Sequence, residues 1–285
     1  MLLIKVDRSP HMQLSCVMAI IISDIHADIK KAQAFLSYKP DAEHIFLGDL
    51  IDSRDPKVTF EEELACLELI LDSDATLIWG NHDLACTQLR PWGTFTRFQI
   101  LPQELTNQYK DSSDYLRSCY QETGGDLCAV QLFIDRIQTH FDRFKVARAV
   151  DGWLCTHAGL SKAVTKELPD CPMDSGDPAK VAAYLNEEFL CECRKDKRPK
   201  GDSPLEYGVG PLFSVSQTRG GSDKYGGIFW YDHRRELVRP DPRVKQIFGH
   251  TPIEGPLKQE TWVNINIECG CWIFDTEADD FVLLK

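Results

Sequence analysis

The sequence contains no apolar run long enough to cross a membrane. Its longest strand-like stretch, residues 16–22, ends at Ser23 and Asp24, far short of the roughly 18 apolar residues that a span requires. No small-residue cleavage site follows it. We therefore expect neither a membrane span nor a signal peptide, and we predict that residues 16–22 form a buried strand.

Positive charge is also scarce. The chain has 32 Lys and Arg against 44 Asp and Glu, a formal net charge of −12. A surface of this sign repels phosphate backbones, so broad binding to nucleic acid is not expected. A local positive site built from metal ions remains compatible with this charge.

The cysteines show no disulfide pattern. There are eleven, an odd number, without the spacing of a disulfide framework. This favours a reducing, cytoplasmic compartment. Cys191 and Cys193, with Cys269 and Cys271, suggest a four-thiolate zinc site, but the C-x-C spacing differs from the usual C-x-x-C. We interpret Cys269, in an apolar tail, as a core residue.

Strand-like runs alternate with helix-like runs along the chain, which favours an α/β fold. The predicted helices cover residues 29–38, a stretch that opens at Thr59, and 178–194 after a capping Asp177. The second helix has an apolar stripe of Leu64, Leu67, Ile70 and Leu71. The predicted strands are 16–22, 44–47, 76–79, 145–150, 153–156 and 244–248, with two or three more in 262–284 around a turn near 277–279. Asp151-Gly152 predicts a hairpin between the fourth and fifth strands.

Two segments do not follow this alternation. Residues 84–143 combine polar stretches with an amphipathic run, 127–144, and we predict a helical insertion that caps the sheet edge. Residues 195–227 are rich in Gly, Pro, Lys, Asp and Ser, which predicts a long functional loop. We expect a single domain over 14–285 that includes this insertion.

Polar residues follow five of the predicted strands, where open α/β sheets place their ligands. They are Asp24 with His26, Asp49 with Asp52, Asn81 with His82, His157, and His250. Carboxylate, imidazole and amide groups without thiolates suit Mn, Fe, Zn, Co or Ni. The set exceeds what one ion needs, so two ions that share a bridging carboxylate fit the count.

These blocks, in this order, resemble the calcineurin-like metallophosphoesterases. They are Asp24-x-His26, Gly48-Asp49-x-x-Asp52, Gly80-Asn81-His82-Asp83, His157-Ala158-Gly159 and Gly249-His250-Thr251-Pro252, followed by a family-like tail at 264–270. The resemblance is closest to the phosphoprotein-phosphatase branch, and it also fits symmetrical dinucleoside-tetraphosphate hydrolases. It implies a β-sandwich flanked by helices, and it does not cover residues 84–143 and 161–227.

The resemblance also implies roles for the residues of the blocks. Asp24 and His26 would hold the first ion, with Asp49 bridging. The second ion would be completed by Asn81, His157 and His250. A water between two divalent ions loses its proton near neutral pH and attacks phosphorus in line. We favour manganese as the metal.

The same resemblance makes His82 the general acid, which protonates the leaving oxygen, and Asp52 the carboxylate that orients it. A histidine beside a carboxylate suits this role. By contrast, we interpret His11, His44, His140 and His233 as structural. Asp28 and Asp83 are interpreted as residues at helix N-termini.

The chain departs from the family at the phosphate-binding arginine. The family pattern is Gly-Asp-x-x-Asp-Arg-Gly, whereas Ser53 follows Asp52 here and Arg54 comes one place later. Arg234 or Arg235 would match a second family arginine, and Arg219 is a further candidate. A guanidinium suits phosphate because it donates two parallel hydrogen bonds.

Three functions follow as hypotheses. The first is a two-metal phosphomonoesterase of the Ser/Thr protein phosphatase type, with a phosphorylated partner as substrate. The displaced Arg54 and the large insertion motivate the second, a dinucleoside-polyphosphate hydrolase. The third, a non-catalytic binding module, is disfavoured because every ligand and His82 are present.

Overall fold

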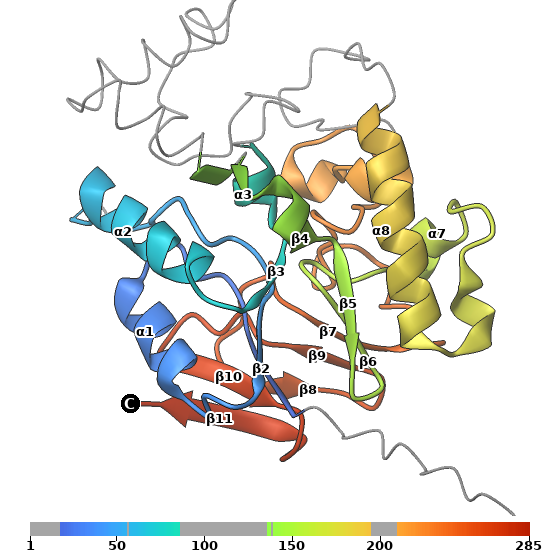
Figure 1. Cartoon of the computed structure of the whole chain (residues 1–285). Coiled ribbons are helices and arrows are strands. Elements are labelled where there is room, and N and C mark those ends of the chain that lie inside the picture. Colours follow the sequence, from blue (N-terminus) through green and yellow to red (C-terminus); the bar gives the residue numbers. More distant parts are fainter. Residues whose placement is uncertain (1–17, 56, 86–135, 138, 195–209) are drawn as a thin grey trace, which may run out of the picture.

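The computed structural model describes residues 18–55, 57–85, 136–137, 139–194 and 210–285 (Figure 1). Their strands form two sheets. The first sheet has the order β11-β10-β1-β2-β3-β4 and the second the order β5-β6-β7-β9-β8. The bounds in the first sheet are β1 Ala19–Ile22, β2 Glu43–Phe46, β3 Thr76–Ile78, β4 Phe144–Lys145, β10 Cys271–Asp275 and β11 Asp280–Leu284. Those in the second are β5 Ala147–Val150, β6 Trp153–Thr156, β7 Lys245–Phe248, β8 Leu257–Lys258 and β9 Trp262–Asn264.

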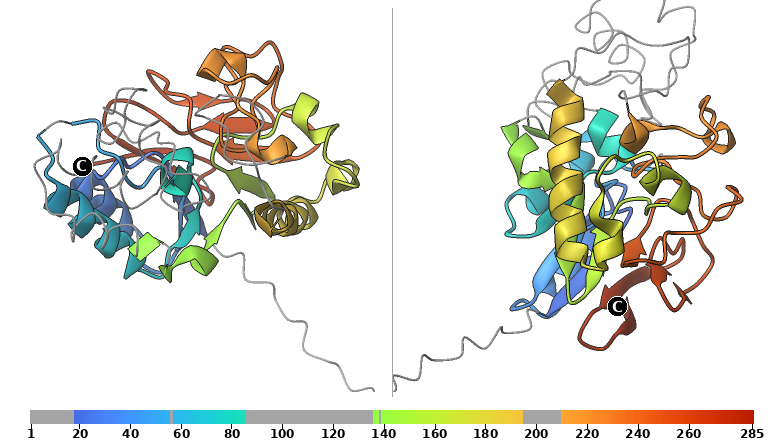
Figure 2. Two further views of the ribbon diagram at one scale, coloured as in Figure 1. Left: turned by 90° about the horizontal axis from the view of Figure 1, so that it is seen from above. Right: turned by 90° about the vertical axis from the view of Figure 1, so that its right-hand side faces the viewer.

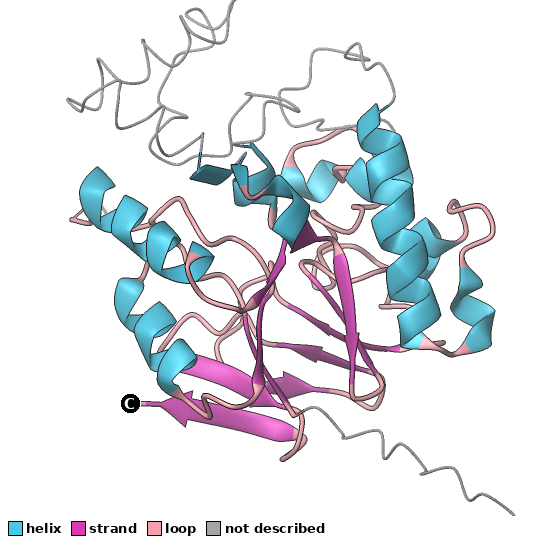
Figure 3. Cartoon of the chain, viewed as in Figure 1, coloured by secondary structure: helices cyan, strands magenta, loops and turns pink. Residues whose placement is uncertain are grey.

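Helices flank the strands (Figure 3). Their bounds are α1 Ile29–Ser37, α2 Phe60–Leu71, α3 Asn81–Ala85, α7 Lys162–Thr165 and α8 Pro178–Arg194. Helices α1 and α2 lie together beside the first sheet, and α8 packs on β5 and β6 (Figures 1 and 2). No helix in the described ranges is both long enough and apolar enough to cross a membrane.

Alternation along the strands builds two apolar layers. In β1, Ile20 and Ile22 belong to the core that includes the buried face of the helices. Ala19 and Ile21 belong to a separate core shared with Ile247 of the second sheet. Because successive side chains of a strand point to opposite faces, one strand serves both layers. The result is the predicted α/β sandwich flanked by helices.

The site depends on parallel pairing within both sheets. Strands β1, β2, β3 and β4 run parallel, and so do β6, β7 and β9. Five of these strands end directly before the predicted polar blocks, so the blocks gather at one edge of the sandwich.

Helix caps fix where α1 and α2 begin. The Asp28 carboxylate accepts hydrogen bonds from the backbone N–H groups of Lys30 and Lys31, as its interpretation as an N-terminal residue requires. Thr59 and Glu62 form a capping box at α2. The predicted stripe of α2 faces the core, with Leu67, Ile70 and Leu71 buried and Leu64 partly buried against them. Glu63 of the same helix is buried as well.

The predicted strand 145–150 is divided between the two sheets. Phe144 and Lys145 pair with β3, whereas Ala147–Val150 pairs with β6. Val146 lies at the crossing, where its N–H donates to Asn186 Oδ1 of α8 at 2.9 Å. Phe144 is therefore a strand residue stacked on Trp79, and the predicted helical run does not extend to it.

Other predictions have mixed outcomes. The hairpin at 151–152 and the turn between β10 and β11 are confirmed. Cys269 is exposed, so its interpretation as a core residue is wrong: the chain turns at Gly270, φ +89°, before β10 begins. The candidate metal groups among the described side chains contain no cysteine. Most of the predicted insertion 84–143, and residues 195–209 of the predicted loop, lie outside the described residues.

Candidate dinuclear metal site

The turns after the strands use left-handed backbone conformations. Positive φ angles occur at Asp24 (52°), His26 (46°), Asp49 (52°), Asp52 (67°) and His250 (62°). Such conformations are uncommon for residues other than glycine and cluster at functional sites. In this protein, these turns bring polar side chains that follow separate strands close to one another.

The first ligand group consists of Asp24, His26 and Asp49, whose potential ligand atoms lie within 4.8 Å of one another. His26 Nε2 lies 3.9 Å from Asp24 Oδ1 and 3.9 Å from Asp49 Oδ2. The other Asp24 oxygen accepts the backbone N–H of His250 at 3.0 Å. The Asp24 carboxylate therefore belongs to the first group and also connects it to the turn after β7 of the second sheet.

The second ligand group consists of Asp49, His157 and His250, with the same 4.8 Å limit. His157 Nε2 lies 3.5 Å from Asp49 Oδ2, 3.1 Å from His250 Nδ1 and 2.9 Å from Asn81 Oδ1. Asp49 thus belongs to both groups, so its carboxylate is the one that two bound ions would share.

Several of these groups carry polar atoms that the protein leaves unsatisfied. Asp24 Oδ1, His26 Nε2 and His250 Nε2 are buried without a hydrogen-bond partner among the described residues. Buried polar atoms without partners are costly and rare. Nδ1 of His26 contacts the Ile51 and Asp52 carbonyls, and Nδ1 of His157 contacts the Leu47 carbonyl at 2.7 Å, so each Nε2 is left as an acceptor. The residues present fit divalent ions on these atoms.

Charges around Asp49, and the burial of His26 and His250, favour the metal-binding forms of these three residues. Burial acts to raise the pKa of Asp49, but His157, His82 and His26 around it hold that pKa well below its ordinary value. Burial lowers the pKa of His26 to about 4 and that of His250 well below its ordinary value. An ionised Asp49 carboxylate and unprotonated His26 and His250 rings are the forms in which these groups bind a metal ion.

His82 and Asp52 form a close pair beside Asp49. His82 Nδ1 lies 2.6 Å from Asp52 Oδ2, and His82 Nε2 lies 3.9 Å from Asp49 Oδ2. Burial acts to lower the pKa of His82, but the Asp49 and Asp52 carboxylates outweigh it and raise this pKa to about 9. The imidazole is thereby kept protonated, as a proton donor requires.

Two further carboxylates brace the site and were not predicted from the sequence. Asp83 accepts the N–H of Gly80 at 3.0 Å with one oxygen and that of Leu50 at 2.9 Å with the other. Glu63 of α2 accepts the backbone N–H of Asp52 at 2.5 Å. The sequence did contain a sign of this role, because Glu63 is an acidic residue on the apolar stripe of the predicted helix. Asp83 lies in the first turn of α3, as expected for a residue at a helix N-terminus. Its carboxylate also links the turn after β2 to the turn after β3.

The same two turns touch through their glycines. A Cβ on Gly48, whose φ is +88°, would lie 2.3 Å from Gly80 N. Only the absence of a side chain allows the backbones to approach this closely. The turn that carries Asp49 is thus packed directly on the turn that carries Asn81 and His82.

Arg54 acts on the site electrostatically. Its side chain is exposed, yet its positive charge contributes to lowering the pKa of His26 and opposes the raised pKa of His82. Arg54 therefore lies within electrostatic reach of both imidazoles, one residue later than the family pattern requires.

Among the other candidate arginines, Arg219 lies beside the site, next to the turn that carries His250. Its Nη2 donates to Thr251 Oγ1 at 3.2 Å, and its Nε lies 3.1 Å from Asp232 Oδ2. Its charge lowers the pKa of His250 after the larger effect of burial. Arg234 Nη1 instead donates to the Pro252 carbonyl, and Arg235 Nη1 to the Thr218 carbonyl at 3.5 Å.

The structure thus brings together eight predicted side chains, whose roles remain predictions: Asp24, His26, Asp49, Asn81, His157, His250, His82 and Asp52. Arg54 and Arg219 adjoin them. Arg234 and Arg235, which the sequence analysis preferred to Arg219, contact main-chain carbonyls beside the site instead.

Comparisons with known proteins were made for sequence and for structure. The family model for calcineurin-like phosphoesterases matches residues 19–254. No curated protein matches the chain. A cold-active protein-tyrosine phosphatase of a psychrophilic Shewanella species aligns at 12% identity over 94% of this chain and 80% of its own, with a TM-score of 0.47.

Two further solved structures resemble the chain more distantly. A protein serine/threonine phosphatase from Saccharomyces cerevisiae aligns at 13% identity over 87% of this chain and 66% of its own, with a TM-score of 0.40. A metallophosphoesterase from Sphaerobacter thermophilus aligns at 19% identity over 54% of this chain and 55% of its own, with a TM-score of 0.28. The family match, which spans most of the chain, establishes that the chain belongs to the calcineurin-like phosphoesterases, metal-dependent hydrolases of phosphoester bonds.

Proposed function

We propose that the chain hydrolyses phosphomonoesters with two divalent ions, and that phosphoserine or phosphothreonine in proteins is its substrate type. The observation that carries this proposal is Asp49, which belongs to both ligand groups and lies 3.9 Å from His82. When bound, the two ions would polarise the phosphoryl group and lower the pKa of water. Manganese is our preferred metal.

The side chains of the chain supply the remaining steps. Asp52 holds His82 by its Nδ1, which leaves Nε2 as the atom that gives a proton to the leaving oxygen. Arg54, on the side of His26, and Arg219, on the side of His250, hold the non-reacting phosphate oxygens. Arg219 is oriented for this task by Asp232 and Thr251. Arg234 and Arg235 are weaker candidates, since their guanidinium groups already contact carbonyls.

A dinucleoside-polyphosphate hydrolase on the same ions is the second candidate. A cavity of about 580 Å³ beside the first ligand group, large enough for a nucleoside, favours it. Product chromatography after incubation with diadenosine tetraphosphate separates the two candidates. Rapid turnover of simple monoesters beside intact tetraphosphate would reject the second.

Hydrolysis of p-nitrophenyl phosphate with Mn²⁺ tests the first candidate. Asp49→Asn should abolish it by removing a charge that both ions need, and His82→Ala should lower kcat by about 10² to 10⁴. His140→Ala serves as a control, because the hydrogen bond of that imidazole within the described ranges is to the Arg136 carbonyl, away from both ligand groups. Absence of hydrolysis with every divalent metal would sink the proposal.

Metal analysis of the purified protein tests the remaining alternative, a non-catalytic module. A protein that neither holds nor takes up divalent ions would support that alternative. A cytoplasmic location stays a prediction, and the unpaired state of the described cysteines is in keeping with it.

A further inference from the structure

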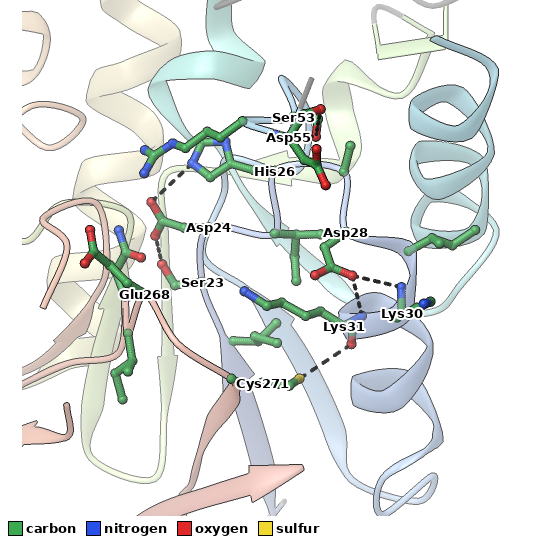
Figure 4. A pocket seen from close by; sticks show the side chains of 18 of the residues that line it. Ser23, Asp24, His26, Asp28, Lys30, Lys31, Ser53, Asp55, Glu268 and Cys271 are labelled. Atoms are coloured by element: carbon green, nitrogen blue, oxygen red, sulfur yellow. Dashed lines mark hydrogen bonds and ion pairs between the residues drawn. The ribbon is translucent and has the colours of Figure 1, made fainter. Parts of the chain in front are cut away.

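The cavity of about 580 Å³ begins at Asp24 and His26 of the first ligand group and extends away from the second. Figure 4 shows its walls, which come from the first turn of α1, the segment before α2 and the loop before β10. Of the side chains assigned above to the ions and the transferred phosphoryl group, Asp24, His26 and Arg54 line this cavity, whereas the walls from α1 and from the loop before β10 carry none of them.

Besides Arg54, two lysines of α1 line the cavity: Lys30, which is exposed, and Lys31. The side chain of Lys31 runs from α1 into the cavity, toward the wall that carries Glu268 (Figure 4). It is partly buried, and no ion pair or side-chain hydrogen bond holds its ammonium group within the described ranges. An ammonium group placed in a cavity without a partner is available to a ligand.

Asn266 supplies a neutral donor to the same cavity. Its side chain is 7% exposed and lines the cavity wall, and its Nδ2 is buried without an acceptor. The backbone around it is satisfied, because its N–H donates to Asn264 Oδ1 and its carbonyl accepts from Ile253. A buried amide donor without a partner is costly, so a ligand that accepts from it would bind favourably.

The carboxylates of the cavity are mostly engaged elsewhere. Asp28, Asp55 and Glu62 each accept backbone N–H groups in local caps. Glu268 is the exception: it is exposed and forms no ion pair in the described part of the chain. The extension thus presents Lys31 on the wall from α1, and Asn266 and Glu268 on the wall from the loop before β10.

We propose that this cavity binds a second anionic group of the substrate, a phosphate or carboxylate carried by the leaving group, through Lys31 and Asn266. The proposal rests on the proposed phosphomonoesterase function and names a feature of its substrate. Glu268 repels the same group and so limits how much negative charge the cavity accepts.

A matched pair of substrates tests this proposal. Phenyl phosphate and 3-carboxyphenyl phosphate differ by one carboxylate, and 1,3-phenylene bisphosphate replaces that carboxylate with a phosphate. We expect kcat/KM to be higher for the two substrates with a second anionic group. Comparison of those two shows which anion the cavity prefers.

Substitutions locate the preference. Lys31→Met should lower kcat/KM by about tenfold for the doubly anionic substrates and leave phenyl phosphate within about twofold, as expected for loss of one charge-assisted hydrogen bond. Glu268→Gln should raise kcat/KM for the same two substrates. Lys57→Met is the control, since that lysine is exposed and near α2 but does not line the cavity.

The outcomes separate this proposal from the one it rests on. Hydrolysis of phenyl phosphate without a Lys31-dependent preference overturns the cavity proposal alone. If phenyl phosphate is not hydrolysed at all, the proposed function fails, and calorimetric titration of the Mn²⁺-loaded protein with 1,3-phenylene bisphosphate still tests the cavity. Equal affinity of the parent protein and the Lys31→Met variant would then reject it.

Discussion

Asp83 spans two turns with its two oxygens, one on the Gly80 N–H and one on the Leu50 N–H. Burial, with the neighbouring Asp49 carboxylate, raises the pKa of Asp83. An amide in its place would offer one acceptor and would turn an NH₂ group toward the other N–H. The residue is therefore suited to positioning Asp49 and His82, and it needs no contact with substrate.

We expect Asp83→Asn to weaken Mn²⁺ binding or lower kcat by about 10-fold to 100-fold, the usual effect of removing a supporting residue around a metal site. Activity measured over a series of Mn²⁺ concentrations separates the two effects. Asp74→Asn, at an exposed position before β3, is the matched control. Unchanged activity at every Mn²⁺ concentration would contradict the positioning role.

At this scale the sequence predicted the residues that follow strands and missed those that act across the fold. The eight clustered side chains are recognisable because each stands at a strand end. Arg219 was named only as a further candidate, because its contact with Thr251 depends on how residues 210–227 fold against the β7 turn. The contact of Glu63 with the site was not predicted, because an acidic residue in the first turn of a helix is already explained by its favourable interaction with the helix dipole.

At the scale of elements, the two central turns of the site are packed glycine against glycine. Gly48 needs both a left-handed backbone and an absent side chain. Gly152, in the β5–β6 hairpin, has a similar φ of +79° but no atom within 4 Å of the position where a Cβ would stand. A comparison of substitutions at Gly48 and Gly152 therefore distinguishes the cost of the left-handed backbone, which both share, from the cost of a steric clash, which only Gly48 has.

We predict that Gly152→Ala costs about 1 kcal/mol of unfolding free energy, from the left-handed backbone alone. Gly48→Ala should cost several times more and should abolish Mn²⁺ binding, because the turns are forced apart. Urea unfolding and metal titration of both variants measure these effects. Similar losses in the two variants would show that close packing of the turns is not what the site requires.

The strand that crosses between sheets marks the limit of sequence prediction for elements. Residues 145–150 have one unbroken strand pattern, and the pattern is correct for every residue except Val146. Membership of two sheets depends on partners distant in sequence, β3 on one side and β6 on the other. Local periodicity cannot encode that choice, whereas the hairpin turn at Asp151-Gly152 is local and was predictable.

For the whole molecule, the outer surface of the second sheet contains a histidine that resists protonation. His233 packs on Phe248 and Trp262, and neither ring nitrogen has a hydrogen-bond partner in the described part of the chain. Burial lowers its pKa to about 4, below the ordinary 6.5. Because the folded state binds this proton more weakly than the unfolded state, the stabilisation is complete above pH 6.5 and is lost as pH falls toward 4.

We therefore expect His233→Phe to reduce the loss of unfolding free energy between pH 6.5 and pH 4 by up to about 2 kcal/mol. Phenylalanine keeps the aromatic packing and cannot take up the proton. Urea unfolding of both proteins at pH 7, 5.5 and 4 isolates the effect, since other titrating groups are common to both. Parallel pH profiles would show that His233 is not the responsible group.

The candidate ligands come from both sheets: Asp24, His26, Asp49 and Asn81 follow strands of the first, and His157 and His250 follow strands of the second. Ions bound to them would link the two halves of the sandwich, and unfolding would have to release those ions. At a free metal concentration 100 times the dissociation constant, each such ion adds about 2.7 kcal/mol to the free energy of unfolding. Cellular metal supply would then govern not only the turnover rate of this protein but also how long it escapes proteolysis.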